Sequence, residues 1–202
     1  MKVLVAFASA LLAAAPAFGV TIVYTTSLSG LNENPVNASP GIGVGTVTVD
    51  TTAHTLRVQS TFSGLTGTTT ASHIHCCAVA PANAGVATTT PSFVGFPLGV
   101  TAGSMDQTYD TLAASSWNPA FITANGGTPA GAEAVLFAGI AAGNAYLNIH
   151  TSTFGGGEIR GFLTPAAAVP EPETYALFLA GLASLGIAAR RRQRREAERR
   201  GR

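Results

Sequence analysis

The sequence predicts a mostly β domain, an antiparallel Greek-key sandwich or barrel with one or two short helical insertions. Residues 20–168 are rich in threonine and glycine, a composition typical of strands joined by glycine turns. Apolar and polar residues alternate in short runs, as they do on strands with one buried face. Turn residues recur roughly every ten positions, which is the spacing of antiparallel sandwiches and barrels. A domain of roughly 149 residues is large enough to bury a core.

The expected strands carry β-branched or alternating sequences and end at glycine, aspartate or asparagine turns. They are residues 21–28, 42–49, 55–62, 69–75, 145–151 and 158–164. The second and third of these form a hairpin around Asp50, and the last two form a looser hairpin through a run of glycines. A long loop, broken by prolines, is expected from the end of the fourth strand to about Thr108.

Two helical insertions interrupt the strands. Asn118 and Thr128 each provide an N-cap side chain directly before a proline, which is favoured at the first helical position. The first helix is expected to end near Gly126. The second is expected over residues 130–142, ended by Gly143.

The N-terminus has the three parts of a secretory signal peptide. Lys2 supplies a basic start, residues 3–15 are apolar, and small residues precede Val20. Cleavage after Gly19 and cleavage after Ala17 fit the pattern equally. The apolar run is too short to span a bilayer. We therefore expect residues 1–19 to be removed on export.

Residues 169–202 form a second signal in three parts. Residues 169–174 are an acidic, proline-rich turn, residues 175–189 are uncharged, and residues 190–202 are rich in arginine. As a helix the middle part is about 22 Å long, short for a hydrocarbon core of ~30 Å. Flanking arginines and local bilayer thinning can make up the difference. Because arginine clusters stay cytoplasmic, we expect this transmembrane helix to place the β domain outside the cytoplasm.

The charge of the β domain excludes an electrostatic nucleic-acid binder. Residues 20–168 contain two basic side chains, Arg57 and Arg160, against six acidic ones, so the net charge is two minus six, or −4. Nucleic-acid binding of that kind needs a basic patch, which two arginines do not make.

Three histidines lie in two short strand motifs. His73 and His75 are two residues apart, so they share one face of a strand, and His150 lies on a later strand. If these strands are neighbours, the imidazoles converge into a copper or zinc site. In that interpretation Arg160 steers an anion and Glu158 is an outer hydrogen-bond acceptor. The alternative is that the histidines bind loops through hydrogen bonds and fix the long excursion after the fourth strand.

Other side chains leave several alternatives open. Cys76 and Cys77 form a strained vicinal disulfide, supply a thiolate to the histidine site, or pair with another chain. Asp106 and Asp110 suggest a weak calcium site. His54 is expected in solvent. Trp117 and Tyr109 are the aromatic candidates for stacking on sugars.

The C-terminal signal resembles a known family. The sequence Val169-Pro170-Glu171-Pro172-Glu173, followed by an apolar span and an arginine cluster, resembles the PEP-CTERM sorting signal of Gram-negative bacteria. The resemblance implies cleavage near Pro170, Glu171 and Pro172 by exosortase, a membrane transpeptidase. It also implies an inner-membrane-anchored precursor, a transient membrane anchor and final export to the outer surface or a biofilm matrix.

The β domain also resembles a known family, over residues 21–164. The segments that carry this resemblance occur in the order of the CHRD (chordin-type) domain. They are residues 28–35, 41–45, 65–67, 73–75, 146–151 and 157–163. The resemblance implies an extracellular β domain with no established enzymatic activity or cofactor. We therefore expect a structural or interaction role, with extracellular polysaccharide or other surface proteins as partners.

A more distant likeness gives the alternative function. A strand with two histidines, a long loop, a late histidine strand and a final arginine strand are similar to copper–zinc superoxide dismutase. This likeness implies that His73, His75 and His150 bind copper and that Arg160 guides an anion. No histidine lies between His75 and His150, so the bridging and zinc ligands are missing. The alternative is thus an extracytoplasmic mononuclear copper-binding or dismutase-like protein.

Overall fold

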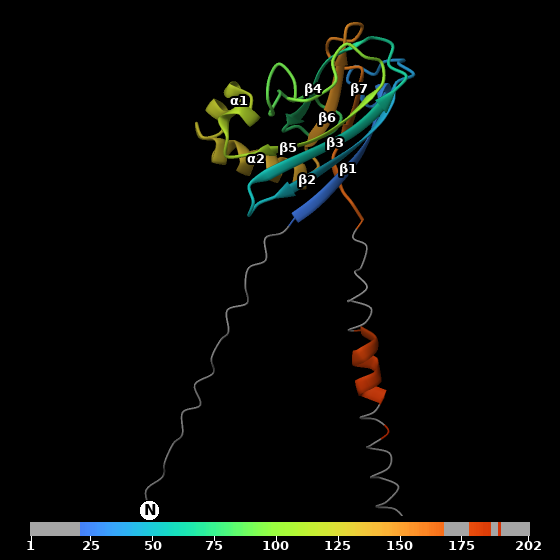
Figure 1. Cartoon of the computed structure of the whole chain (residues 1–202), viewed down its shortest axis with the longest axis vertical. Helices are drawn as coiled ribbons and strands as arrows, with labels where there is room; N and C mark the ends of the chain where they lie inside the picture. The colour runs from blue at the N-terminus through green and yellow to red at the C-terminus, as the bar shows by residue number, and fades with distance from the viewer. Residues whose placement is uncertain (1–20, 168–177, 187–189, 191–202) are drawn as a thin grey trace, which may run out of the picture. The chain divides into compact units, whose positions relative to one another are not determined.

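The computed structural model describes residues 21–167, 178–186 and 190, and shows a curled sheet of antiparallel strands (Figure 1). The strands are β1 (Thr21–Ser29), β2 (Ile42–Asp50), β3 (Thr55–Ser63), β4 (Thr69–Cys76), β5 (Gly103–Asp110), β6 (Ala145–Thr151), β7 (Ile159–Phe162) and β8 (Thr164–Pro165). The helices are α1 (Pro119–Ala124) and α2 (Pro129–Ala141), with single 3₁₀ turns η1 (Gly30–Asn32) and η2 (Ala114–Ser116).

The strand order brings β4 and β6, which are far apart in the sequence, side by side. The order is β4-β6-β7-β1-β2-β3-β5, and β8 pairs with β1. The expected hairpin of β2 and β3 is present, with Asp50 opposite Thr55 at its end. The prediction of a mostly antiparallel β domain with short helices is therefore confirmed, in the form of a half-barrel.

Two details of the predicted strands are wrong. Residues 103–110, expected in the long loop, form β5 and pair with β3 along its length. Most side chains of β5 are exposed and only Met105 is buried, so an apolar alternation hardly marks this edge strand. The last expected strand is divided, because Leu163 separates β7 from β8.

The core lies between the inner face of the curled sheet and α2. Alternate residues of β1, β2 and β3 point inward, as the period of a strand requires, and Val47 and Val58 are fully buried. They pack with Ile74 of β4, Leu147 of β6 and other apolar side chains from β7 and α2. This packing fixes which faces of β4 and β6 carry the histidines.

Both helices begin at the predicted caps. The side chain of Asn118 accepts a hydrogen bond from the amide of Ala120, and the Thr128 hydroxyl accepts one from Gly131. Each cap is followed by a proline, which fixes the first turn. Figure 1 shows α1 and α2 together beside one end of the sheet.

The two ends of the chain lie mostly outside the described residues. This holds for the expected signal peptide (residues 1–19), the sorting motif (169–174) and most of the arginine-rich tail. Residues 178–186 are helical and exposed. Within the described part of the chain, no helix has both the length and the apolar character needed to cross a membrane.

Candidate metal centre

The structure brings the three predicted histidines together on one side of β4 and β6. His73 and His75 come from β4, and His150 from β6, where its backbone pairs with Ala71. One nitrogen from each ring lies within 4.8 Å of the others. Ring centroids are separated by 5.2 Å for His73 and His150 and by 5.6 Å for His75 and His150. Among the described residues, no other group of three or more potential metal ligands lies so close together.

One nitrogen of each ring is hydrogen-bonded to a backbone carbonyl. His73 Nε2 lies 2.7 Å from the oxygen of Pro91. His75 Nδ1 lies 2.9 Å from the oxygen of Ala84, and His150 Nδ1 lies 3.0 Å from that of Gly155. A carbonyl only accepts, so these ring nitrogens carry the hydrogen. In a neutral imidazole the other nitrogen then has a free lone pair.

The nitrogens left with lone pairs are His73 Nδ1, His75 Nε2 and His150 Nε2. All three are buried and have no hydrogen-bond partner. Leaving a buried acceptor unpaired costs about 1–3 kcal/mol. Three such acceptors in one place call for a shared partner, either a hydrogen-bond donor such as a water molecule or a metal ion.

A metal ion fits this arrangement after a small contraction. Copper or zinc bound to imidazole at about 2.0–2.1 Å separates its nitrogens by roughly 3.5 Å. The histidine nitrogens lie within 4.8 Å of one another, so the rings need to approach by about 1 Å. The carbonyl bonds orient each ring, as outer hydrogen bonds do in known metal sites.

Burial keeps the rings neutral. It lowers the pKa of both His73 and His75 from 6.5 to about 4, although the bonds to Pro91 and Ala84 act in the opposite direction. Burial also lowers the pKa of His150. Protons therefore compete weakly with a metal ion for these nitrogens near neutral pH.

Arg160 lies behind the histidines and is 1% exposed. Its guanidinium lies 4.6 Å from the centre of the Tyr146 ring, which in turn stacks on His75 at 4.9 Å. It donates hydrogen bonds to the oxygens of Asn32 (2.6 Å) and Pro81 (2.7 Å) and to the side chain of Asn83. Arg160 thus tethers two loops, whereas guiding an anion would need an exposed cation.

Glu158 is fully buried and holds a turn in place. Its carboxylate accepts bonds from the Ser39 and Thr151 hydroxyls and from the amides of Thr66 and Gly67. Burial opposes its ionisation, but these four bonds outweigh burial and hold the pKa below its ordinary value. Glu158 was expected to accept a hydrogen bond from a metal-binding histidine. In the structure backbone carbonyls accept the hydrogen bonds of all three rings instead.

Sequence reasoning missed Glu33. This carboxyl is 5% exposed, and one of its oxygens lies 3.7 Å from Arg160 Nε. Burial raises its pKa to about 7, although the guanidinium acts in the opposite direction. The loop that carries Glu33 showed only turn residues in the sequence, which give no sign of a buried charge.

Cys76 and Cys77 are joined in a disulfide directly after His75. The bridge packs on α2 at Gly139, where an added Cβ atom would lie 2.5 Å from Cys77 Sγ. Both sulfur atoms are in the disulfide bond, so neither cysteine provides a thiolate to the histidine site.

Several other expectations have specific outcomes. His54, expected in solvent, lies 3.0 Å from Glu133 of α2. Asp106 binds Arg57 instead of sharing a site with Asp110. Trp117 is 2% exposed and donates to a backbone oxygen, so its ring offers no face to a sugar.

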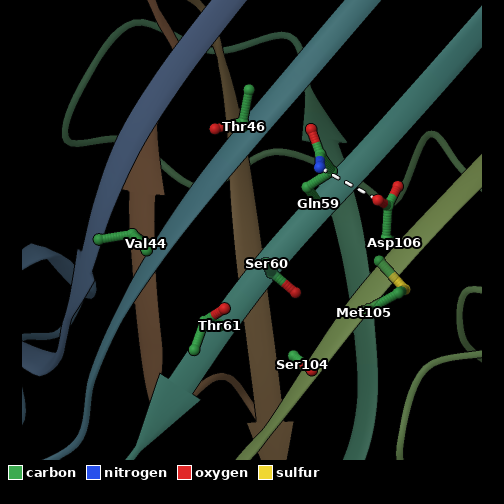
Figure 2. Close-up of a pocket in the computed structure, with 8 residues that line it drawn as sticks. All are labelled: Val44, Thr46, Gln59, Ser60, Thr61, Ser104, Met105 and Asp106. Carbon is green, nitrogen blue, oxygen red and sulfur yellow. Dashed lines mark hydrogen bonds between the residues drawn. The ribbon is translucent and has the colours of Figure 1, made fainter.

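The outer face of β2, β3 and β5 carries a separate polar hollow. Its volume is about 320 Å³. Hydroxyl and amide side chains predominate around it, and Gln59 donates a hydrogen bond to Asp106 (Figure 2). The lining residues are Val44, Thr46, Gln59, Ser60, Thr61, Ser104, Met105 and Asp106.

Comparison with known proteins defines the class of this exported β protein. The model of the CHRD domain family matches residues 24–163, and the chain belongs to that family. The PEP-CTERM protein-sorting motif matches residues 168–193, so the protein is exported and is processed by exosortase. The two matches are to a non-enzymatic domain and a sorting signal. No curated protein and no solved structure shows a significant match.

Proposed function

We propose that the CHRD domain of this exported protein binds one transition-metal ion, copper or zinc, through His73, His75 and His150. Two observations carry the proposal: one nitrogen from each of the three rings lies within 4.8 Å of the others, and each ring keeps one buried nitrogen without a hydrogen-bond partner. Imidazole is a suitable ligand for both metals. The proposed role is binding, and no catalytic step is assigned to the site.

A purely structural role explains only half of the contacts. Hydrogen bonds from His73 to Pro91 and from His75 to Ala84 do attach the loop after β4 to the sheet. Each of those bonds uses one ring nitrogen. A structural role leaves the second nitrogen of each of the three neighbouring rings buried and without a donor, whereas buried polar groups are normally paired.

We also propose that the metal-binding domain acts at the outer surface or in the extracellular matrix. The sorting motif supports this location, since the match to it marks an exported protein. The mature protein would correspond to residues 20–168, after removal of the signal peptide and of residues 169–202.

The test of metal binding is titration of the purified exported protein with copper and with zinc, after removal of bound metal by a chelator. We expect one ion per chain. The variant His73→Ala/His75→Ala should lose it, and His54→Ala, whose imidazole pairs with Glu133 elsewhere, should keep it. Equal binding by the double variant and the parent would contradict the proposal.

A second candidate function is interaction with matrix polysaccharide at the outer sheet face. The hollow lined by Thr46, Thr61 and Ser104 offers neutral hydrogen-bonding groups to sugar hydroxyls. We expect Thr61→Lys, which places a long charged chain there, to reduce retention on isolated matrix polysaccharide. Retention unchanged by this substitution would count against the face.

A further inference from the structure

The proposed metal site lacks negative charge. Its three ligands are neutral imidazoles, and no carboxylate or thiolate of the described residues joins them. Each ring already donates its only N–H to a carbonyl, which holds the proton in place. The neighbouring Cys76 is committed to a disulfide.

A positive charge lies against the Tyr146 ring, which in turn stacks on His75. This charge is the guanidinium of Arg160. Glu33 partly balances this charge, because one of its oxygens lies 3.7 Å from Arg160 Nε. No carboxylate belongs to the cluster of ligand atoms, so none offsets the charge of a bound metal ion by direct contact.

Because the site is buried, the charge of the ion strongly affects the free energy of binding it. The cost of moving an ion from water into a protein interior rises with the square of its charge, so a divalent ion costs about four times as much as a monovalent one. Buried charges are normally compensated by a partner of opposite charge. Here all three ligand nitrogens are buried and uncharged.

The number of ligands also favours a monovalent ion over zinc. Zinc is almost always bound by four ligands, and a site with three protein ligands keeps a water in the fourth position. The cluster supplies one nitrogen from each of three rings, so zinc bound there would need a water as its fourth ligand. Cuprous ion, with one charge and a filled d shell, is stable with three nitrogen ligands.

We propose that the site formed by His73, His75 and His150 selects Cu(I) over Zn(II) and Cu(II). This inference rests on the proposed metal-binding function and specifies its ion. At the cell surface such a site holds copper in its reduced form, between β4, β6 and the loops that carry Ala84, Pro91 and Gly155.

The experiment is a competition titration of the purified exported protein under anaerobic conditions. Cu(I) is titrated against a chromophoric cuprous chelator, and Zn(II) and Cu(II) against chelators of known affinity. We expect a dissociation constant for Cu(I) at least about 100-fold below that for either divalent ion. Binding of Zn(II) or Cu(II) as tight as that of Cu(I) would overturn the inference but leave the metal site standing. Binding of no ion would overturn both.

A charge variant tests the reason for the selectivity. Asn148 is 2% exposed, pairs with His73 across the strands and lies two residues before His150. Asn148→Asp adds a buried negative charge beside the site, so we expect it to improve Zn(II) affinity relative to Cu(I) by about tenfold or more. The matched control is His54→Ala, which should keep the selectivity of the parent. An unchanged ratio in a folded Asn148→Asp protein would contradict the electrostatic explanation.

Discussion

Acid should destabilise the metal-free domain through two particular histidines. Burial lowers the pKa of His73 and His75 to about 4, from 6.5 in an unfolded chain. Between these values the unfolded chain takes up protons that the folded chain refuses, so stability falls as the pH falls from 6.5 toward 4. From pH 7 to pH 5 the loss is about 2 kcal/mol for each ring, or about 4 kcal/mol for the pair.

Glu33 changes the stability in the opposite direction, so the prediction is best tested as a difference. Its pKa is raised to about 7, and its protonation in the folded state adds stability as the pH falls from 7 toward 4.5. The variant His73→Gln/His75→Gln keeps Glu33 but removes the two imidazoles. The pH dependence of the parent and that of the variant should therefore differ by about 4 kcal/mol.

The assay is chemical denaturation of both proteins at pH 7 and pH 5, with a chelator present. The parent should lose more free energy of unfolding than the variant on acidification. Proton NMR titration gives an independent measurement, in which the ring signals of His73 and His75 should not shift above pH 5. A difference between the two proteins below about 1 kcal/mol would refute the reasoning that these rings are buried and neutral.

Three further predictions concern stability around the site. Gly139→Ala should lower the free energy of unfolding, measured by thermal denaturation, by about 1–3 kcal/mol, because the added Cβ meets the disulfide. Gly85→Ala is its control, because no atom lies within 4 Å of the Cβ added there. Glu158→Gln should cost about 1–3 kcal/mol, since its new NH₂ group would face hydrogen-bond donors, and an unchanged melting temperature would contradict the bonds described. Arg160→Lys should destabilise the fold by about 2–4 kcal/mol, since one ammonium replaces a planar guanidinium that binds three partners. Urea denaturation measures this loss, and an unchanged midpoint would contradict the proposed tether.

The histidine cluster was predictable from strand geometry. The two-residue spacing of His73 and His75 places them on one face, and the apolar Ile74 between them fixes which face points into the core. That β4 lies beside β6 did not follow from the sequence, because pairing of distant strands depends on the whole topology. Convergence of the histidines required that these two strands be neighbours, and the structure meets this condition.

The backbone partners of the histidines were beyond sequence reasoning. The carbonyls of Ala84, Pro91 and Gly155 belong to loops, and any residue type supplies the same oxygen. The role of Arg160 also depends on loop positions, since an arginine on a strand is equally compatible with solvent and with a buried tether. Edge strand β5 was missed for a related reason, because its mostly exposed side chains give little apolar alternation.

The central claim is that one ion binds between three specified nitrogen atoms. Anomalous diffraction from crystals of the copper-loaded protein, measured at the copper absorption edge, tests it most directly. The account predicts one strong peak within about 2.2 Å of His73 Nδ1, His75 Nε2 and His150 Nε2. A peak elsewhere on the chain, or no peak at these atoms in protein that carries one copper in solution, would contradict it.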